Sequence, residues 1–322
     1  MIKKALIIST GGTIVSVEKG EGAEPDESAS KSIVGIAKNC LRERGCTCEA
    51  VAAFGSAGYD SSDISPREWL ALTAIINAAV SRGVKKVLVI HGTDTMAYTA
   101  AWLSLTVPAD TAIVLTGSQR PRDARDFDGI TNINCAVKSL CKHENGVYIN
   151  FAAKDFRAPY VHKKDAQGIC AYATTTDDIS LQLARVKNIP SLPYIDDWQK
   201  VAAQMCVMHI HPTIIPSFSP CKILILVGYG AGNIPQRVRE NIRTAYANCE
   251  KPVIIAASSC ARGAKSPSSY GGVGMAGLTK DNFLVFNQGK YSIEFLIALS
   301  YLTLLISSNE PEKILGSYLE KL

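Results

Sequence analysis

Short runs of aliphatic residues alternate with segments of helical hydrophobic spacing along the first half of the chain. Each run leads into a loop rich in Gly, Ser or Thr, and the runs are Ala5–Ile8, Val87–Ile90 and Ala112–Leu115. The segments with helical spacing lie near residues 32–44, 66–82 and 96–105. Strands that alternate with helices are typical of βαβ units, which build a parallel, doubly wound sheet.

The same alternation returns in the last third of the chain after a break. Residues 185–203 contain Pro190 and Pro193 and have no strong period, so we interpret them as a linker. Further strands and a final apolar helix are expected at 207–210, 222–227, 252–257 and about 292–307. We therefore predict an α/β fold of two doubly wound domains, a larger N-terminal parallel-sheet domain at 1–184 and a smaller C-terminal α/β domain at 204–322. A length of 322 residues fits roughly two domains.

One polar segment, residues 16–30, interrupts the first domain directly after its first sharp turn. It is rich in Gly, Glu and Ser and has little apolar surface to bury. Such a segment is typical of a mobile loop or lid over a site. A solvated surface loop without a role in function fits its composition equally well.

Composition and charge place the chain among ordinary globular proteins. Apolar residues make up 47% and charged residues 20%, which excludes a disordered chain. The net charge is only +5, and the basic residues are scattered rather than clustered, so nucleic-acid binding is not expected. The longest apolar stretch, 295–306, is shorter than the roughly 20 residues that span a bilayer, and a buried core helix is favoured over a membrane segment.

The cysteines and histidines suggest a reducing compartment and no metal site. The ten cysteines include no CxxC pair, and the start of the chain lacks the apolar run of a signal peptide, so we predict a cytoplasmic protein without disulfides. His209 and His211 alternate on an expected strand and could share a metal ion. No carboxylate or cysteine stands at ligand spacing beside them, which favours a surface or satisfied pair.

Hydroxyl and carboxylate side chains follow three strands of the expected first sheet. The strand ends deliver Thr13, the pair Thr93 and Asp94, and Ser118 to one edge. In an open parallel sheet, ligands bind outside the carboxyl ends of the strands. Any one of these residues could simply cap a helix, but their repetition at one edge, together with glycines, favours a site.

The chemistry that these residues support needs no cofactor. The chain has no P-loop, no GxSxG elbow and no HExxH motif, and the glycines at 228–232 miss the spacing of a dinucleotide loop. A Thr hydroxyl becomes a nucleophile when a base removes its proton, and backbone N–H groups of Gly-rich turns can hold an oxyanion. An Asp can accept a substrate ammonium. The set suits acyl transfer from a small amino-acid amide.

At STGGTI (9–14) and VIHGTDTMAYTA (89–100), the chain resembles the bacterial L-asparaginase family in its cytoplasmic type I form. The likeness continues through the segments DSSD (60–63), TGSQRP (116–121) and GYGAGNIP (228–235) and covers most of the chain. The resemblance implies a catalytic N-terminal domain, a smaller second domain, no metal or cofactor, and homodimers or homotetramers whose sites form between subunits.

The resemblance also assigns roles at matching positions. It implies that Thr13 is the nucleophile, Thr93 the second catalytic threonine, Asp94 the partner of the substrate ammonium, and Lys163 the lysine that acts through Thr93. The adjacent Lys164 leaves open a one-residue shift of that match. The residues expected to bind substrate, either through side chains or as close backbone and oxyanion donors, are Gly12, Asp60, Ser61, Ser62, Gly92 and Ser118.

One departure from the family pattern concerns the first loop. The family has a Tyr there that activates the nucleophile, and Ala23 occupies that position in this chain. Tyr59 could replace it from another direction, or Glu24 could serve as the base. Alternatively, the enzyme is slow or acts on a different amide.

The function predicted from the sequence is hydrolysis of L-asparagine to L-aspartate and ammonia through a threonine acyl-enzyme. The alternatives are hydrolysis of another amide, such as L-glutamine, D-asparagine or a peptide amide, and a catalytically silent homologue that only binds an amino acid. An amidotransferase component that delivers ammonia to a partner is a further alternative.

Overall fold

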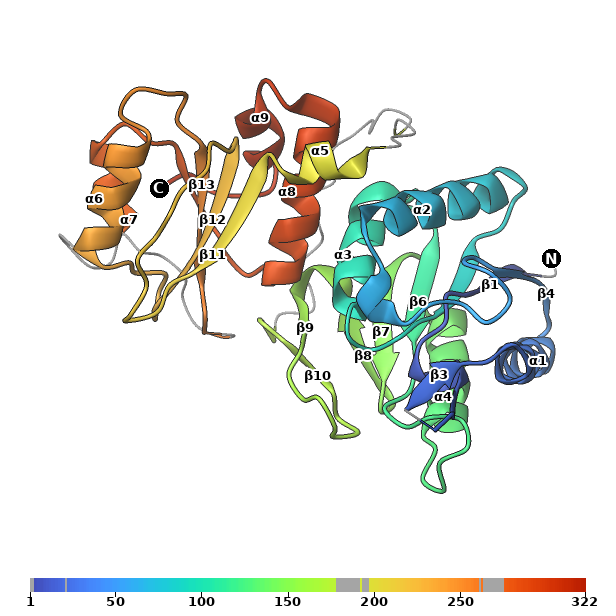
Figure 1. Cartoon of the computed structure of the whole chain (residues 1–322). Helices are drawn as coiled ribbons and strands as arrows, with labels where there is room; N and C mark the ends of the chain where they lie inside the picture. The colour runs from blue at the N-terminus through green and yellow to red at the C-terminus, as the bar shows by residue number, and fades with distance from the viewer. Residues whose placement is uncertain (1–2, 21, 178–191, 193–196, 261, 263–274) are drawn as a thin grey trace. The chain divides into compact units, whose positions relative to one another are not determined.

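The computed structural model describes residues 3–20, 22–177, 192, 197–260, 262 and 275–322 (Figure 1). It divides into two compact units, Met1–Ala173 and Thr174–Leu322. The boundary predicted at residue 184 and most of the predicted linker lie outside the described residues and stay predictions.

The first unit contains a six-stranded sheet with the order β4–β1–β5–β6–β7–β8. The first five of these strands run parallel, and β8 pairs antiparallel with β7. A mainly parallel sheet was predicted for this domain, and this prediction is confirmed. The strand bounds are Lys3–Ser9 (β1), Cys46–Ala52 (β4), Lys86–Ile90 (β5), Ala112–Thr116 (β6), Gly146–Phe151 (β7) and Lys154–Arg157 (β8).

Helices cover both faces of this sheet (Figure 1). The helices are α1 (Glu27–Arg42), α2 (Pro66–Ser81), α3 (Met96–Thr106) and α4 (Gly129–Lys142). On one face, α1 and α4 pack together and bury Ile33 and Ile133 against strand residues such as Ile7 and Val114. On the other face, α2 and α3 pack together through the stacked rings of Trp69 and Trp102, whose centroids are 5.6 Å apart.

The segment 16–30 differs from the loop that was expected. It forms a hairpin of β2 (Ser16–Glu18) and β3 (Ala23–Pro25), and α1 then begins at Glu27, several residues before the predicted helix start. The Asp26 carboxylate caps α1 by accepting from the Ala29 N–H at 3.0 Å. Polar residues fill this first turn because much of it faces solvent, so the sequence pattern alone did not mark it as a helix.

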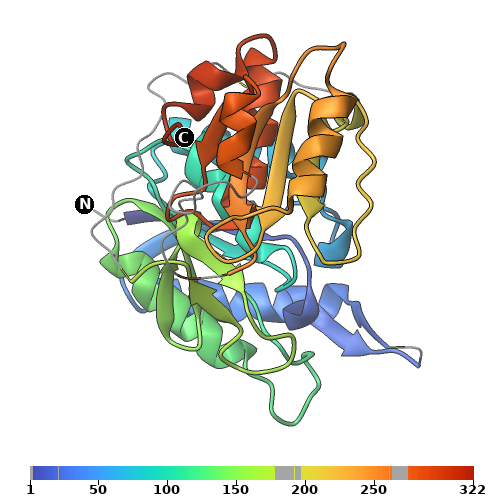
Figure 2. The ribbon, with the colours of Figure 1, turned by 90° about the vertical axis from the view of Figure 1, so that its left-hand side faces the viewer.

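The second unit contains a parallel sheet with the order β11–β12–β13–β14. The strands are β11 (Met205–His209), β12 (Ile223–Gly228), β13 (Val253–Ser258) and β14 (Val285–Asn287). Its helices flank this sheet (Figure 2) and are α5 (Trp198–Ala202), α6 (Gln236–Ala245), α7 (Met275–Lys280), α8 (Ile293–Ser307) and α9 (Pro311–Leu315). The smaller α/β domain predicted here is confirmed.

Two findings bear on expectations from composition. All ten cysteines are free thiols. Among the described residues, no helix combines the length and the apolarity that crossing a membrane requires.

Candidate active site

Three loops of the first unit meet at the carboxyl ends of β1 and β5. Gly12, which follows β1, has a φ of +85°, and a Cβ there would lie 2.2 Å from the Cα of Gly92, which follows β5. A Cβ on Gly92 would in turn lie 2.5 Å from the Ser61 hydroxyl oxygen. Only glycines permit such approaches. Thr13 and Thr93 each follow one of the two touching glycines, so the backbone segments that carry these threonines are in contact.

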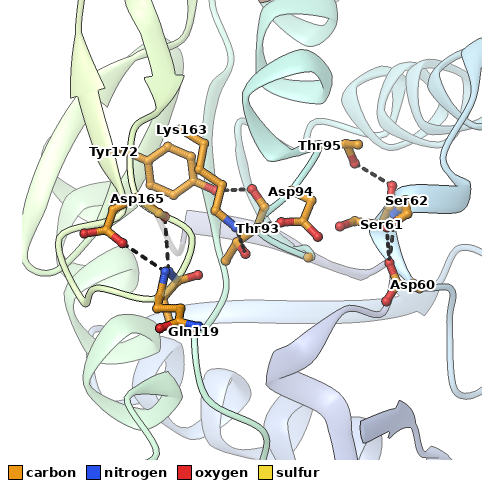
Figure 3. A network of polar contacts seen from close by, with 12 residues as sticks. Asp60, Ser61, Ser62, Thr93, Asp94, Thr95, Gln119, Lys163, Asp165 and Tyr172 are labelled. Carbon is orange, nitrogen blue, oxygen red and sulfur yellow. Dashed lines mark hydrogen bonds and ion pairs between the residues drawn. The ribbon is translucent and has the colours of Figure 1, made fainter. Parts of the chain in front are cut away.

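Lys163 joins this cluster from β9 (Val161–Lys163), which pairs with β10 (Tyr172–Thr174). Its ammonium donates to the Thr93 hydroxyl at 2.8 Å and to the Asp94 carboxylate at 2.6 Å. The Lys163 side chain is 17% exposed, whereas that of Asp94 is 62% exposed. The structure thus brings together three of the predicted catalytic residues and leaves the Asp94 carboxylate open to a ligand (Figure 3).

The predicted carboxylate-binding segment forms a short 3-10 turn at Ser61–Asp63. Asp60 caps this turn, because its carboxylate accepts from both the N–H and the hydroxyl of Ser62 at 2.8 Å. Ser61 is buried, and its carbonyl accepts from the Thr95 hydroxyl at 2.7 Å. In Figure 3, Asp94 lies between Thr93 and this turn. Asp60 therefore shapes the segment, while Ser61 stands beside the glycine contact.

Thr13 begins a 3-10 turn, Thr13–Val15, and is half-buried. Within the described part of the chain, its hydroxyl has no hydrogen-bond partner. The Gly12 amide donates to the Tyr59 carbonyl at 2.9 Å, so this N–H is already engaged. The Gly92 amide has no acceptor among the described residues and is the better candidate for an oxyanion donor.

The residues considered as substitutes for the loop tyrosine occupy two places. Ala23 and Glu24 lie on β3 and are exposed. Tyr59 is 42% exposed, and its ring stacks on Phe54 with the centroids 5.2 Å apart. Which of these groups, if any, takes the role of the family tyrosine stays a hypothesis.

The loop after β6 is held rigidly. The Ser118 hydroxyl is buried and donates to the Arg120 carbonyl at 2.6 Å, so it is engaged in its own turn. The Asp128 carboxylate accepts from the backbone N–H of Gln119 at 3.1 Å, and Asn132 donates to both Asp128 and the Gly117 carbonyl at 2.9 Å. The Ser118 hydroxyl therefore stabilises the loop after β6 and is not free to donate to a ligand.

His91, at the end of β5, is completely buried beside the site. Burial lowers its pKa to about 4, so the imidazole is neutral. Its Nδ1 lies 2.8 Å from the Gly92 carbonyl, which can only accept, so Nδ1 carries the proton. Nε2 then accepts from the Thr99 hydroxyl at 2.9 Å. His91 thus fixes the loop that carries Thr93.

Two residues at the site were not predicted. The Tyr172 hydroxyl donates to the Thr93 carbonyl at 2.6 Å (Figure 3). The Gln119 amide donates to the Gly168 carbonyl at 3.1 Å and so connects the β6 loop to the loop after β9. Gln119 lies in the segment TGSQRP, which carries the resemblance but assigned it no role, and Tyr172 lies outside every such segment, so only the three-dimensional contacts identify their roles.

The two histidines that alternate in the sequence lie at the end of β11 and just beyond it. His209 and His211 are both exposed, and the His211 Nδ1 lies 3.0 Å from the Thr213 hydroxyl. Among the residues with described positions, no three His, Cys, Asp or Glu side chains are grouped closely enough for a metal ion.

Comparison with known proteins matches this architecture to one family. Residues 4–189 match the family model described as "Asparaginase, N-terminal". The chain belongs to the asparaginase family. An L-asparaginase of Thermococcus kodakarensis is 27% identical over 267 residues, covering 78% of this chain and 79% of the relative. An L-asparaginase of Bacillus licheniformis is 32% identical over 52% of each chain.

A second group of relatives has a different name and a greater length. One of the subunits of a glutamyl-tRNA(Gln) amidotransferase from Methanococcus vannielii is 30% identical over 149 residues. The match covers 46% of this chain and only 34% of that relative, so the similarity extends over about a third of its length.

Solved structures of the family share the fold along almost the whole chain. The L-asparaginase from Thermococcus kodakarensis superposes with a TM-score of 0.73 at 23% identity, covering 97% of this chain and 96% of that one. A probable cytoplasmic L-asparaginase from Campylobacter jejuni gives 0.70 at 21% identity, with 98% of each chain covered. At these identities the likeness establishes the two-domain fold.

Proposed function

We propose that this family member hydrolyses L-asparagine to L-aspartate and ammonia, with Thr13 as the nucleophile. The observation that carries the proposal is the hydrogen bond from the Lys163 ammonium to the Thr93 hydroxyl. The contact between Gly12 and Gly92, the residues directly before Thr13 and Thr93, supports it. A threonine, a lysine-bound second threonine and an exposed carboxylate form a set that suits amide acyl transfer. A protein that only binds an amino acid has no need of this set.

Substrate recognition follows from the charges of the site. Asp94 is exposed and anionic, so it suits the substrate ammonium. The Ser61–Ser62 turn lies on the far side of Asp94 from Thr93 and suits the α-carboxylate (Figure 3). The side-chain amide then extends toward Thr13, and the Gly92 amide is available to the carbonyl oxygen as negative charge develops.

The chemistry has two balanced steps. The Thr13 oxygen bonds to the amide carbon, its proton passes to the amide nitrogen, the C–N bond breaks and ammonia leaves. Water then attacks the resulting ester, and aspartate leaves as Thr13 regains its proton. Because Lys163 donates to the Thr93 oxygen, the Thr93 hydroxyl keeps its own proton and can donate it to the leaving nitrogen. The pair takes up a proton from Thr13 or from water only when Lys163 is a neutral amine.

The test is ammonia release by the purified full chain from L-asparagine, L-glutamine and D-asparagine. Thr13→Ala should lower the rate by at least about a thousandfold, because it removes the nucleophile. Thr47→Ala is the matched control, since it removes the same hydroxyl from an exposed position near the start of β4. Equal activity of Thr13→Ala and the wild type would overturn the acyl-enzyme mechanism.

Glutamine is the second candidate substrate. Two observations favour including it: Ala23 replaces the tyrosine that the resemblance leads one to expect, and part of the chain is similar to a component of an amidotransferase. Faster ammonia release from L-glutamine than from L-asparagine would transfer the proposal to that amide. Binding of asparagine without release from any amide would favour a silent homologue.

The oligomeric state and the cellular location of the protein are also proposals. We expect a homodimer or homotetramer, which light scattering on the purified chain would measure. A cytoplasmic location agrees with ten free thiols, because such thiols persist in reducing compartments.

A further inference from the structure

Tyr172 contacts the backbone of Thr93 but has no role in the proposed reaction steps. Its side chain is 3% exposed, and its ring packs edge-on against Phe151 with the centroids 5.3 Å apart. The hydroxyl donates to the backbone carbonyl of Thr93 at 2.6 Å. A buried tyrosine hydroxyl needs a partner, and here that partner belongs to the residue whose side chain receives Lys163.

The backbone of Tyr172 is tied to the backbone of Lys163. Tyr172 lies on β10, which pairs with β9, the strand that ends at Lys163. Beside this pair, the Lys164 N–H donates to the Ala171 carbonyl at 2.8 Å. The hairpin therefore moves Lys163 and Tyr172 together.

These contacts close a ring. Lys163 reaches Thr93 through the Thr93 side chain at 2.8 Å, and Tyr172 reaches the same residue through its backbone carbonyl at 2.6 Å (Figure 3). The β9–β10 hairpin thus contacts Thr93 both at its side chain and at its backbone. With only the lysine contact, the Thr93 loop could rotate relative to the hairpin, and the distance between the Lys163 nitrogen and the Thr93 oxygen would vary.

We propose that Tyr172 is a positioning residue for the amide hydrolysis: it fixes the Thr93 backbone against the β9–β10 hairpin and so sets the Lys163–Thr93 hydrogen bond. The inference rests on the proposed function. Its hydroxyl contacts the backbone carbonyl of Thr93, so its effect on the chemistry passes through Thr93. Tyr172 therefore brings a phenol to the site from β10, whereas the position of the family tyrosine, Ala23, lies on β3.

Tyr172→Phe is the decisive variant, because it keeps the ring and its packing and removes only the hydroxyl. Tyr148→Phe is the matched control: Tyr148 is also buried in the first unit, and its ring stacks on His143. The first measurement is the rate of ammonia release against substrate concentration and pH. We expect kcat to fall about tenfold in Tyr172→Phe with KM almost unchanged, because a displaced proton relay slows chemistry more than binding.

The pH profile separates positioning from simple loss of folded enzyme. A smaller folded fraction would lower the kcat profile without changing its shape. A loosened Lys163–Thr93 hydrogen bond should change the shape of the kcat profile, and Tyr148→Phe should leave the profile as in the wild type.

A second measurement does not depend on turnover. The rate of Lys163 acylation by acetic anhydride, followed by mass spectrometry with exposed Lys154 as the internal reference, reports how firmly the ammonium is held. We expect several-fold faster labelling of Lys163 in Tyr172→Phe and no change in Tyr148→Phe. Unchanged labelling, or a kcat and pH profile equal to the wild type, would overturn the proposal. Faster labelling in a protein that hydrolyses no amide would overturn the proposed function and keep the positioning contact.

Discussion

The contact between Gly12 and Gly92 allows a sharp prediction about stability. Gly12→Ala would place a methyl group 2.2 Å from the Cα of Gly92 and 2.4 Å from its nitrogen, at a φ of +85°. Gly12 has a ψ of 179°, and this pair of dihedral angles is essentially restricted to glycine, so it costs an L residue about 1–3 kcal/mol. Forcing two backbones apart adds about 1–3 kcal/mol, as in an overpacked core. The free energy of unfolding should therefore fall by about 2–6 kcal/mol.

Gly83→Ala is the control that isolates the close approach. Gly83 follows α2 with a φ of +87°, almost the value at Gly12, and nothing lies within 4 Å of a Cβ built there. Only the backbone cost applies, so we expect a loss of about 1–2 kcal/mol. The difference between the two variants measures the contact between the two loops together with the added cost of the ψ of 179° at Gly12.

Urea unfolding followed by tryptophan fluorescence is the assay. Trp69 and Trp102 are buried in the unit that contains both glycines, and a Trp198→Phe background removes the tryptophan of the second unit. Equal midpoints for Gly12→Ala and Gly83→Ala would refute the reasoning, because the Gly12 loop would then have room for a methyl group.

Three further predictions concern charge. Lys163→Ala should lower kcat in an ammonia-release assay by about 10²–10⁴, because the proton relay is lost. Lys164→Ala should leave kcat unchanged. The reverse result would assign the catalytic role to Lys164. His91 has a pKa lowered to about 4 by burial, so the unfolded chain binds more protons between about pH 4 and 6.5, and stability should fall by about 3 kcal/mol as the pH drops across that window. Urea midpoints of the wild type and His91→Gln at pH 7 and pH 4.5 measure this slope, which should shrink in the variant. Burial works against the charge on Asp155, but hydrogen bonds from three side chains outweigh it and lower its pKa, so its contribution is present above about pH 4 and is lost as the pH falls further. Asp155→Asn should therefore lose stability at pH 7 and show a weaker decline between pH 5 and 3; an unchanged decline would assign acid sensitivity to other groups.

Hydrophobic periodicity predicted the strands that carry the site because those strands are buried on both faces. The run Val87–Ile90 is continuous in the sequence, and β5 covers Lys86–Ile90 with every residue buried. A parallel strand between two layers of helices needs such a run. The strand ends, and with them the places of Thr13 and Thr93, therefore followed from the pattern.

Elements with mixed polarity were harder to predict. β4 is an edge strand in which buried and exposed positions are mixed, and its Cys-Thr-Cys-Glu sequence resembles a loop. Helix α4 buries Asn132, whose amide holds the β6 loop, so its polar residues interrupt the apolar stripe. In both cases, contacts with distant residues decide the structure, and local propensity does not encode them.

The proton relay of the proposed reaction also depends on contacts between residues that are distant in the sequence. The resemblance places a tyrosine where the chain has Ala23, which has no polar side chain. Thr13 and Thr93 each follow one of two touching glycines, and Lys163 donates to the Thr93 hydroxyl at 2.8 Å. The backbone segments before Thr13 and Thr93 are in contact, so a proton relay from Thr13 through Thr93 would need no group from the β2–β3 hairpin, provided that Lys163 accepts as a neutral amine. If the enzyme is fast, the efficiency of that route depends on how firmly Thr93 is held, which makes the contact between its carbonyl and Tyr172 as consequential as any residue that the sequence motifs marked.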